Sequence, residues 1–232
     1  DKIGPLARSA EDCLLVLDAI QGADHLDHAA IDAPLNYQSS DKFQRNIRIG
    51  YTPADFQRRY PFHEQDSLVL TQLESLGFEL VPIELPDFPP ISHILTVEAA
   101  AAFDELTRSN RDDELVRQVR NAWPNTFRAA RFVPAVEYVQ ANRARTQLIQ
   151  AMEDEVFQQV DLYVHPSWAS PSLRITNYTG HPCLVVPNGF QDNGRPTSIT
   201  FTGKLYDEGT LVAVGQAWQE VTEWDERHPG GF

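Results

Sequence analysis

The stretch that decides the fold begins with Ile47-Arg48-Ile49-Gly50-Tyr51 and closes with Phe78-Glu79-Leu80-Val81-Pro82-Ile83. Both runs have the composition of strands, and the first alternates apolar and polar residues. Between them a helical pattern ends at Gly77, and its apolar face carries Leu68, Val69, Leu73 and Leu76. A strand–helix–strand unit crosses onto a parallel sheet, which needs helices on both faces. The stretch therefore predicts the α/β class.

Further helices are predicted outside this unit. Ser9 opens a capping box for a helix over Ala10–Gln21. Helical patterns also cover Ser92–Ser109, Pro134–Gln159 and Asp207–Trp224. We expect buried stripes on the last two, formed by Val136, Val139, Leu148, Met152, Val156 and Val160 on one and by Leu211, Val214, Trp218 and Val221 on the other.

The last third of the chain reads as strands joined by turns. Asp161–Val164 is a predicted strand that enters the loop His165–Ser172. After the turn Gly180-His181-Pro182, Cys183–Pro187 and Ile199–Phe201 are expected to pair as a hairpin, because Asn193-Gly194 between them is a strong turn dipeptide.

Composition limits the function classes. The chain has 232 residues, is 42% hydrophobic and carries a net charge of −14, which argues against binding to nucleic acid or to an anionic membrane. No apolar run approaches the roughly 20 residues of a membrane helix. Cys13 and Cys183 lie in apolar runs, so we expect buried free thiols of a reduced compartment, with a disulfide as the alternative and the cytoplasm as the expected location. The start at Asp1 looks internal, which leaves a targeting peptide on a longer parent open.

Two segments carry a family resemblance. Asp1-Lys2-Ile3-Gly4-Pro5-Leu6-Ala7-Arg8-Ser9-Ala10-Glu11-Asp12 and Ile175-Thr176-Asn177-Tyr178-Thr179-Gly180-His181-Pro182-Cys183-Leu184-Val185-Val186-Pro187-Asn188-Gly189-Phe190 resemble blocks of the amidase signature family, serine hydrolases that cleave carboxylic amides. The resemblance covers nearly the whole chain. It implies a partial amidase-signature fold, a mixed β-sheet covered by helices on both faces, with residues 1–232 as the C-terminal part of a single amidase domain.

The chemistry of that family is missing from these residues. Its members use a serine nucleophile, a second serine in a cis peptide and a lysine base, held in a Gly/Ser-rich stretch that is absent here. The three lysines, Lys2, Lys42 and Lys204, are expected to be solvated rather than desolvated in a cleft. We therefore assign no catalytic residue, metal or cofactor, and expect the isolated chain to be inactive.

Other nucleophiles and metal sites are disfavoured. Ser167 and Ser170 lie near His165, with His181 not far along the chain, but the Gly-x-Ser-x-Gly elbow is absent. The run Asp24-His25-Leu26-Asp27-His28 has ligand residue types at short spacing, and we interpret it as a solvated turn with a weak surface metal site as the alternative.

The resemblance implies that the loop after Val164 and the Asn-x-x-Gly-x-Pro turn help to shape the acyl and amide pocket. The pocket candidates are Trp168, Ser170, Asn177 and His181. For Trp168 the alternative is core packing, and for Asn177 it is satisfaction of turn amides. Ser170 stands where relatives that supply ammonia for tRNA transamidation usually carry an aspartate. The resemblance is therefore to general amidases more than to the glutamine-hydrolysing component of those amidotransferases.

The leading hypothesis is the C-terminal portion of an amidase, whose parent hydrolyses small linear amides through an acyl-serine intermediate. The alternatives are a non-catalytic binding or scaffold protein derived from the same fold and a metal hydrolase using His25 and His28. If half of the fold is missing, apolar faces are uncovered, so self-association is expected.

Overall fold

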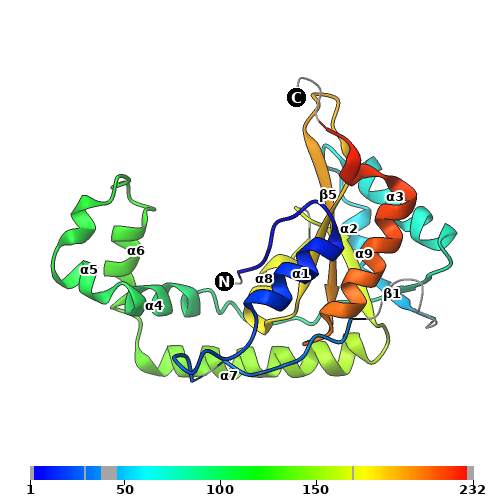
Figure 1. Ribbon diagram of the computed structural model, residues 1–232. Helices are drawn as coiled ribbons and strands as arrows, with labels where there is room; N and C mark the ends of the chain where they lie inside the picture. Colours follow the sequence, from blue (N-terminus) through cyan, green and yellow to red (C-terminus); the bar gives the residue numbers. More distant parts are fainter. Residues whose placement is uncertain (1–2, 29, 38–45, 169, 229–232) are drawn as a thin grey trace. The chain divides into compact units, whose positions relative to one another are not determined.

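The computed structural model describes residues 3–28, 30–37, 46–168 and 170–228 (Figure 1). The chain divides into two compact units. The sheet unit comprises Asp1–Leu85 and Met152–Phe232, and the helical unit comprises Pro86–Ala151.

The sheet unit is built on five strands in the order β2-β1-β3-β5-β4. Their bounds are Arg48–Tyr51 for β1, Glu79–Pro82 for β2, Leu162–Pro166 for β3, Cys183–Phe190 for β4 and Pro196–Gly203 for β5. β1 pairs in parallel with β2 and β3, whereas β5 pairs antiparallel with β3 and β4. The predicted strand–helix–strand unit and the hairpin around Asn193-Gly194 are confirmed, and together they make the sheet mixed.

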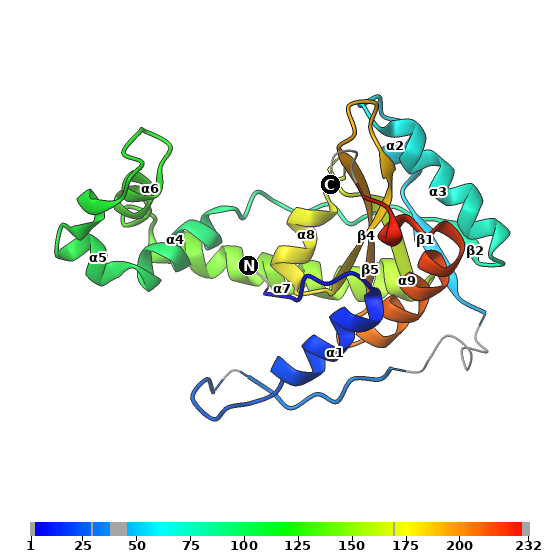
Figure 2. The ribbon, with the colours of Figure 1, turned by 45° about the horizontal axis from the view of Figure 1, so that its top comes forward.

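Three helices cover the core face of the sheet. These are α1 (Ala10–Ile20), α3 (His63–Ser75) and α9 (Glu208–Thr222), and α1 lies beside α9 (Figure 2). The short helix α2 (Pro53–Phe56) follows β1, and a 3-10 turn, Trp224–Glu226, follows α9. The core combines apolar side chains of the sheet with those of α3 and α9, among them Ile49, Leu73, Val164, Phe201 and Trp218.

Two predicted core positions on these helices are wrong. Leu68 is 59% exposed on α3 and Val221 is 56% exposed near the end of α9. Each lies at the edge of its helix's apolar stripe, where spacing alone does not decide which neighbours cover it. Val69 and Leu73 of α3 are fully buried, as predicted.

The opposite face of the sheet is covered by a π-helical turn, Met152–Phe157, and by α8 (Ser172–Thr179). Helices therefore lie on both faces, as predicted, although α8 occupies a stretch that the sequence pattern assigns to loop and turn. Cover is incomplete over the edge strand β4, where Cys183 is exposed and Val185 is 57% exposed. Neither cysteine forms a disulfide, but the prediction that they are buried is wrong, because Cys13 is only half-buried and Cys183 is exposed.

The helical unit contains α4 (His93–Ala102), α5 (Asp104–Arg108), a 3-10 turn (Arg111–Glu114), α6 (Trp123–Ala130) and α7 (Ala135–Ala151). The single helix predicted over Ser92–Ser109 is broken at Phe103. The helix predicted from Pro134 to Gln159 instead ends at Ala151 and continues as the π-helical turn. Val136 and Val139 of its predicted stripe are exposed, whereas Leu148, Met152, Val156 and Val160 are buried.

Candidate functional site

A row of polar side chains lies on the face of the sheet opposite the core. In β3 and β5 the core residues Leu162, Val164, Ile199 and Phe201 alternate with Tyr163, His165, Thr200 and Thr202. Because side chains alternate along a strand, the second set shares the other face, together with Ser198 and, from β4, Cys183. We call these residues the polar face. The alternation of Ser/Thr with Ile/Phe over 198–202 is visible in the sequence and could have identified it.

His165 is locked inside this face. Its Nδ1 lies 3.1 Å from the Pro166 carbonyl oxygen, which can only accept, so Nδ1 carries the proton and donates. Its Nε2 therefore accepts from the Thr202 hydroxyl at 3.1 Å. Burial lowers the pKa of His165 to about 4, so the imidazole is neutral and weakly basic near pH 7. Its one basic nitrogen is thus engaged by a buried hydroxyl.

Thr202 joins several other members of the polar face. The Cys183 Sγ lies 3.4 Å from its Oγ1. The Tyr163 hydroxyl is buried next to Ser172 and Thr202, and burial raises the pKa of Tyr163 above its ordinary value. Because Thr202 is fully buried, it anchors this network rather than offering a reactive hydroxyl.

Ser167 ties the loop after β3 to the polar face, and Ser170 ties it to the first residue of α8. Ser167 Oγ donates to the Ser198 carbonyl at 2.9 Å and lies 2.8 Å from Thr200 Oγ1. Ser170 Oγ donates to Ser172 Oγ at 3.0 Å and accepts from the Ser172 amide at 3.2 Å. The serines of the loop thus contact hydroxyls and backbone groups, whereas the ring nitrogens of His165 are bonded to Pro166 and Thr202. The disfavoured Ser–His arrangement between this loop and His165 is therefore not formed.

The four pocket candidates lie in different environments. Trp168 is 79% exposed, so core packing does not explain it. Ser170 is half-buried in the loop. Asn177 lies exposed on α8, where its Nδ2 donates to the Leu173 carbonyl within the same helix at 2.9 Å. The loop thus presents Trp168 to solvent, while Ser170 and Asn177 bond locally.

His181 is the buried member of the set. Its ring stacks on Phe157 with centroids 4.9 Å apart, and its Nε2 lies 3.7 Å from a Glu153 carboxylate oxygen. Thr179 Oγ1 donates to the Ile175 carbonyl at 3.0 Å, so it accepts from His181 Nδ1 at 2.7 Å. His181 therefore fastens the turn after α8 to the π-helical turn, and Gly180 permits that turn by adopting φ 84°.

An apolar groove lies beside the edge strand β4. It has a volume of about 270 Å³ and is lined by the segment Gly4–Ala7, α1, α9 and residues 182–185 of β4 and the preceding turn. Cys13 and Cys183 both line it. Sequence reasoning missed this groove because its walls come from the two ends of the chain.

The lysines and the short His/Asp run offer no catalytic constellation among the described residues. Lys204 keeps a third of its side chain exposed, with Nζ 4.0 Å from Asp161 Oδ1. Lys2 and Lys42 lie outside the described residues. Within the part of the chain that the structure describes, which includes Asp24 to His28, no three His, Cys, Asp or Glu side chains form a metal-binding group. No helix among the described residues is long and apolar enough to cross a membrane.

The mixed sheet with helices on both faces defines an α/β protein, and comparison with known proteins identifies its family. The family model described as Amidase matches residues 1–177, so the chain belongs to the amidase family. It is 26% identical to an amidase of Pseudomonas putida, over 99% of this chain and 55% of that protein. It is 29% identical to the A component of the glutamyl-tRNA(Gln) amidotransferase of Roseiflexus castenholzii, over 99% of this chain and 56% of that protein.

Solved structures agree on the fold. The native peptide amidase from Stenotrophomonas maltophilia matches with a TM-score of 0.75 and 23% identity, over 99% of this chain and 54% of that one. A bacterial aryl acylamidase of the amidase signature family matches with a TM-score of 0.75 and 19% identity, over 96% of this chain and 53% of that one. The chain spans about half the length of the relatives it matches.

Proposed function

We propose that this chain is the C-terminal portion of an amide hydrolase that cleaves small linear amides through an acyl-serine intermediate. In this proposal the chain supplies a wall of the acyl and amide pocket, while the nucleophile and the base belong to another part of the parent. The family match over residues 1–177 carries the assignment.

The contacts of the polar face support the proposal that the nucleophile and the base lie in another part of the parent. A serine nucleophile needs a base whose free nitrogen faces its hydroxyl. His165 Nε2 is engaged by Thr202, and Ser167 donates to a backbone carbonyl. Lys204, the one lysine among the described residues, is partly exposed beside a carboxylate. These residues therefore provide no base whose free nitrogen faces a serine hydroxyl, because the buried imidazole of His165 is engaged by Thr202 and Lys204 is partly solvated.

We propose Trp168, Ser170, Asn177 and His181 as pocket residues, and the contacts of three of them support particular roles. The exposed indole of Trp168 is available for an acyl group. Ser170 positions the loop through Ser172, and His181 positions the following turn through Thr179 and Phe157.

A fluorophosphonate reagent, which labels activated serines, tests the proposal. The purified chain should show no adduct by intact mass spectrometry and no hydrolysis of acetanilide. The polypeptide encoded by the extended upstream reading frame should take up one equivalent and hydrolyse acetanilide. A triple Ser167→Ala/Ser170→Ala/Ser172→Ala variant of the longer protein should still be labelled. An adduct on any side chain of the 232-residue chain would overturn the proposal.

We also propose that the parent prefers ordinary carboxylic amides to glutamine. Ser170 provides no negative charge for a glutamine α-ammonium group, and its hydroxyl is bonded to Ser172. In the longer protein, Ser170→Asp should raise glutaminase activity relative to acetanilide hydrolysis, whereas Ser172→Asp should not, because it buries a carboxylate next to Tyr163. A wild-type protein that hydrolyses glutamine faster than acetanilide would contradict this preference.

The engaged hydroxyls and imidazole also favour a second candidate, a non-catalytic binding or scaffold protein that kept the fold. The coding sequence upstream of Asp1 separates the two proposals. An in-frame lysine followed by a Gly/Ser-rich segment supports the hydrolase, whereas a start codon close to Asp1 supports the scaffold.

A further inference from the structure

The helical unit contains a cavity that the proposed amidase chemistry does not use. Its volume is about 560 Å³, within the range of small-ligand pockets. Its lining includes the apolar residues Leu115, Val116, Trp123 and Pro124 and the cationic residue Arg117. We propose that this cavity binds a small planar aromatic carboxylate, with its ring stacked on Trp123 and its carboxylate paired with Arg117.

A column of aromatic rings ends at this cavity. Phe127 is buried and stacks on two rings, on Phe103 at 5.2 Å and on Trp123 at 5.5 Å between centroids, with interplanar angles of 24° and 27°. Trp123 is 51% exposed although one side of its indole is covered by Phe127. A planar ring in the cavity would extend this column, the offset-stacked arrangement that aromatic pairs favour.

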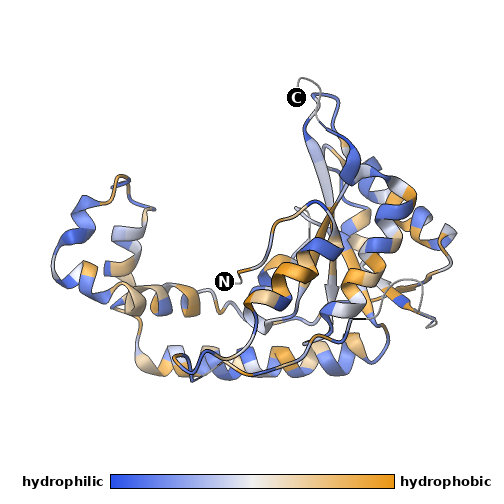
Figure 3. Cartoon of the chain, in the orientation of Figure 1, coloured by the Kyte–Doolittle hydropathy of each residue, from blue (hydrophilic) through white to orange (hydrophobic). Residues whose placement is uncertain are grey.

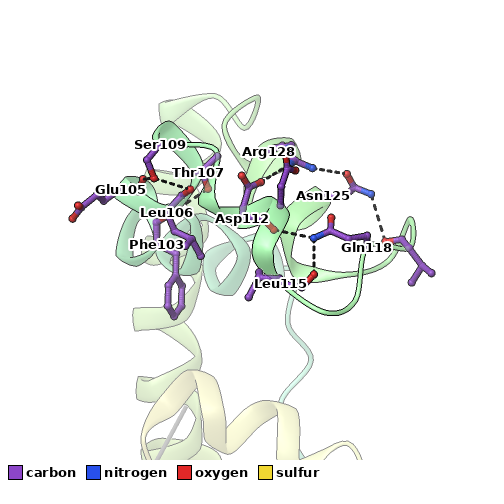
Figure 4. A network of polar contacts seen from close by, with 12 residues as sticks. Phe103, Glu105, Leu106, Thr107, Ser109, Asp112, Leu115, Gln118, Asn125 and Arg128 are labelled. Carbon is purple, nitrogen blue, oxygen red and sulfur yellow. Dashed lines mark hydrogen bonds and ion pairs between the residues drawn. The ribbon is translucent and has the colours of Figure 1, made fainter.

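The wall that carries Arg117 is held in place by polar contacts to the buried residue Asp112. Asp112 is fully buried and pairs with Arg128, Oδ2 to Nη2, at 2.5 Å. Gln118 Nε2 donates to the carbonyls of Asp112 at 2.9 Å and Leu115 at 2.7 Å (Figure 4). The irregular segment between the 3-10 turn and α6 is therefore anchored at its base, so the cavity does not have to be ordered by its ligand.

The charge of the cavity selects an anion. Arg117 is the one charged residue among the described residues that line it, in a chain of net charge −14. Its Nη2 donates to the neutral Asn121 side chain at 2.8 Å. Across the described residues, no carboxylate lies within ion-pair distance of Arg117, and a guanidinium has five N–H donors. A carboxylate can therefore take the remaining donors in the bidentate geometry that arginine favours.

The proposal is tested by titrating the full chain with benzoate, benzamide and acetate and measuring saturation-transfer NMR. Benzoate should bind saturably. Benzamide, which keeps the ring and lacks the charge, should bind roughly tenfold more weakly, and acetate, which lacks the ring, should show no saturable binding. Equal affinity for benzoate and benzamide, or no saturable benzoate signal at millimolar concentrations, would overturn the proposal without any variant.

Matched variants locate the site. Arg117→Gln should raise the Kd for benzoate roughly tenfold, and Trp123→Leu roughly fivefold. The controls are Arg120→Gln, which removes the same charge outside the cavity lining, and Phe132→Leu, which changes an aromatic residue that is 87% exposed. Both controls should keep the wild-type Kd. Equal weakening by Arg120→Gln and Arg117→Gln would show a diffuse charge effect instead of this site. Circular dichroism confirms that the variants keep their helices.

Discussion

Replacing Leu73 with alanine should destabilise the sheet unit far more than the same change at Leu68, which lies on the solvent-exposed side of the same helix, α3. Leu73 is fully buried in the core cluster that contains Trp218, whereas Leu68 is 59% exposed. A buried Leu→Ala change costs about 2–5 kcal/mol, from lost transfer free energy and the residual cavity. An exposed substitution on the same helix stays within about 0.5 kcal/mol, and the alanine helix propensity is gained equally in both variants.

Urea unfolding followed by tryptophan fluorescence measures the difference. The comparison is best made in a Trp123→Phe background, because Trp168, Trp218 and Trp224 all lie in the sheet unit. The urea midpoint should then fall strongly for Leu73→Ala and stay close to the parent value for Leu68→Ala. If the two variants lose the same free energy of unfolding, α3 does not turn Leu73 towards the core and the core assignment fails.

Three further predictions concern the sheet unit. Burial raises the pKa of Asp66 in the folded state. The stability that the protonated Asp66 carboxyl contributes is therefore complete below the unfolded pKa and is lost as pH rises through the folded pKa. Asp66→Asn should gain stability relative to wild type as pH increases, and a difference in the free energy of unfolding that stays constant with pH would refute this. A Cβ at Gly215 would lie 2.4 Å from a Leu184 methyl carbon and 3.1 Å from the Ala10 Cβ, which has no rotamer by which to move away, so Gly215→Ala should lower the free energy of unfolding by about 1 kcal/mol despite its better helix propensity, and an unchanged urea midpoint would contradict that packing. Sedimentation velocity should show that the isolated chain associates as its concentration rises, because Leu6 and Val185, which line the apolar groove, are exposed and α1 is largely apolar (Figure 3). A chain that stays monomeric at all concentrations would contradict this prediction.

The functional proposals depend on different parts of the molecule, so they can fail separately. The absence of an activated serine is tested by covalent labelling, and the pocket role of Ser170 is tested by substrate preference in the longer protein. The aromatic carboxylate site lies wholly within the helical unit and is tested by ligand binding alone. An inactive chain that does not bind benzoate would refute only the aromatic carboxylate site, whereas an active chain that binds benzoate would refute only the proposed division between this chain and the rest of the parent.

Local signals in the sequence determined much of the fold. Ser9 accepts the Asp12 amide at 2.9 Å and starts α1, as its capping pattern predicts. Gly77 and Gly194 adopt positive φ where the helix after β1 and the hairpin were predicted to turn. These features could be predicted because each depends on a few neighbouring residues. The family resemblance, and with it the mixed sheet, came from contiguous blocks for the same reason.

Tertiary structure alone decided which side chains are covered and which groups meet. Val136 and Val139 have the spacing of a buried stripe yet remain exposed, because burial depends on which element packs against α7 and not on helical period. His165 and Thr202 meet only when β3 and β5 pair antiparallel, so the buried hydroxyl that engages the imidazole could not be read from chain order. Periodicity sets the direction of a side chain, whereas its neighbours, and therefore its chemistry, are set by contacts between residues far apart in the chain.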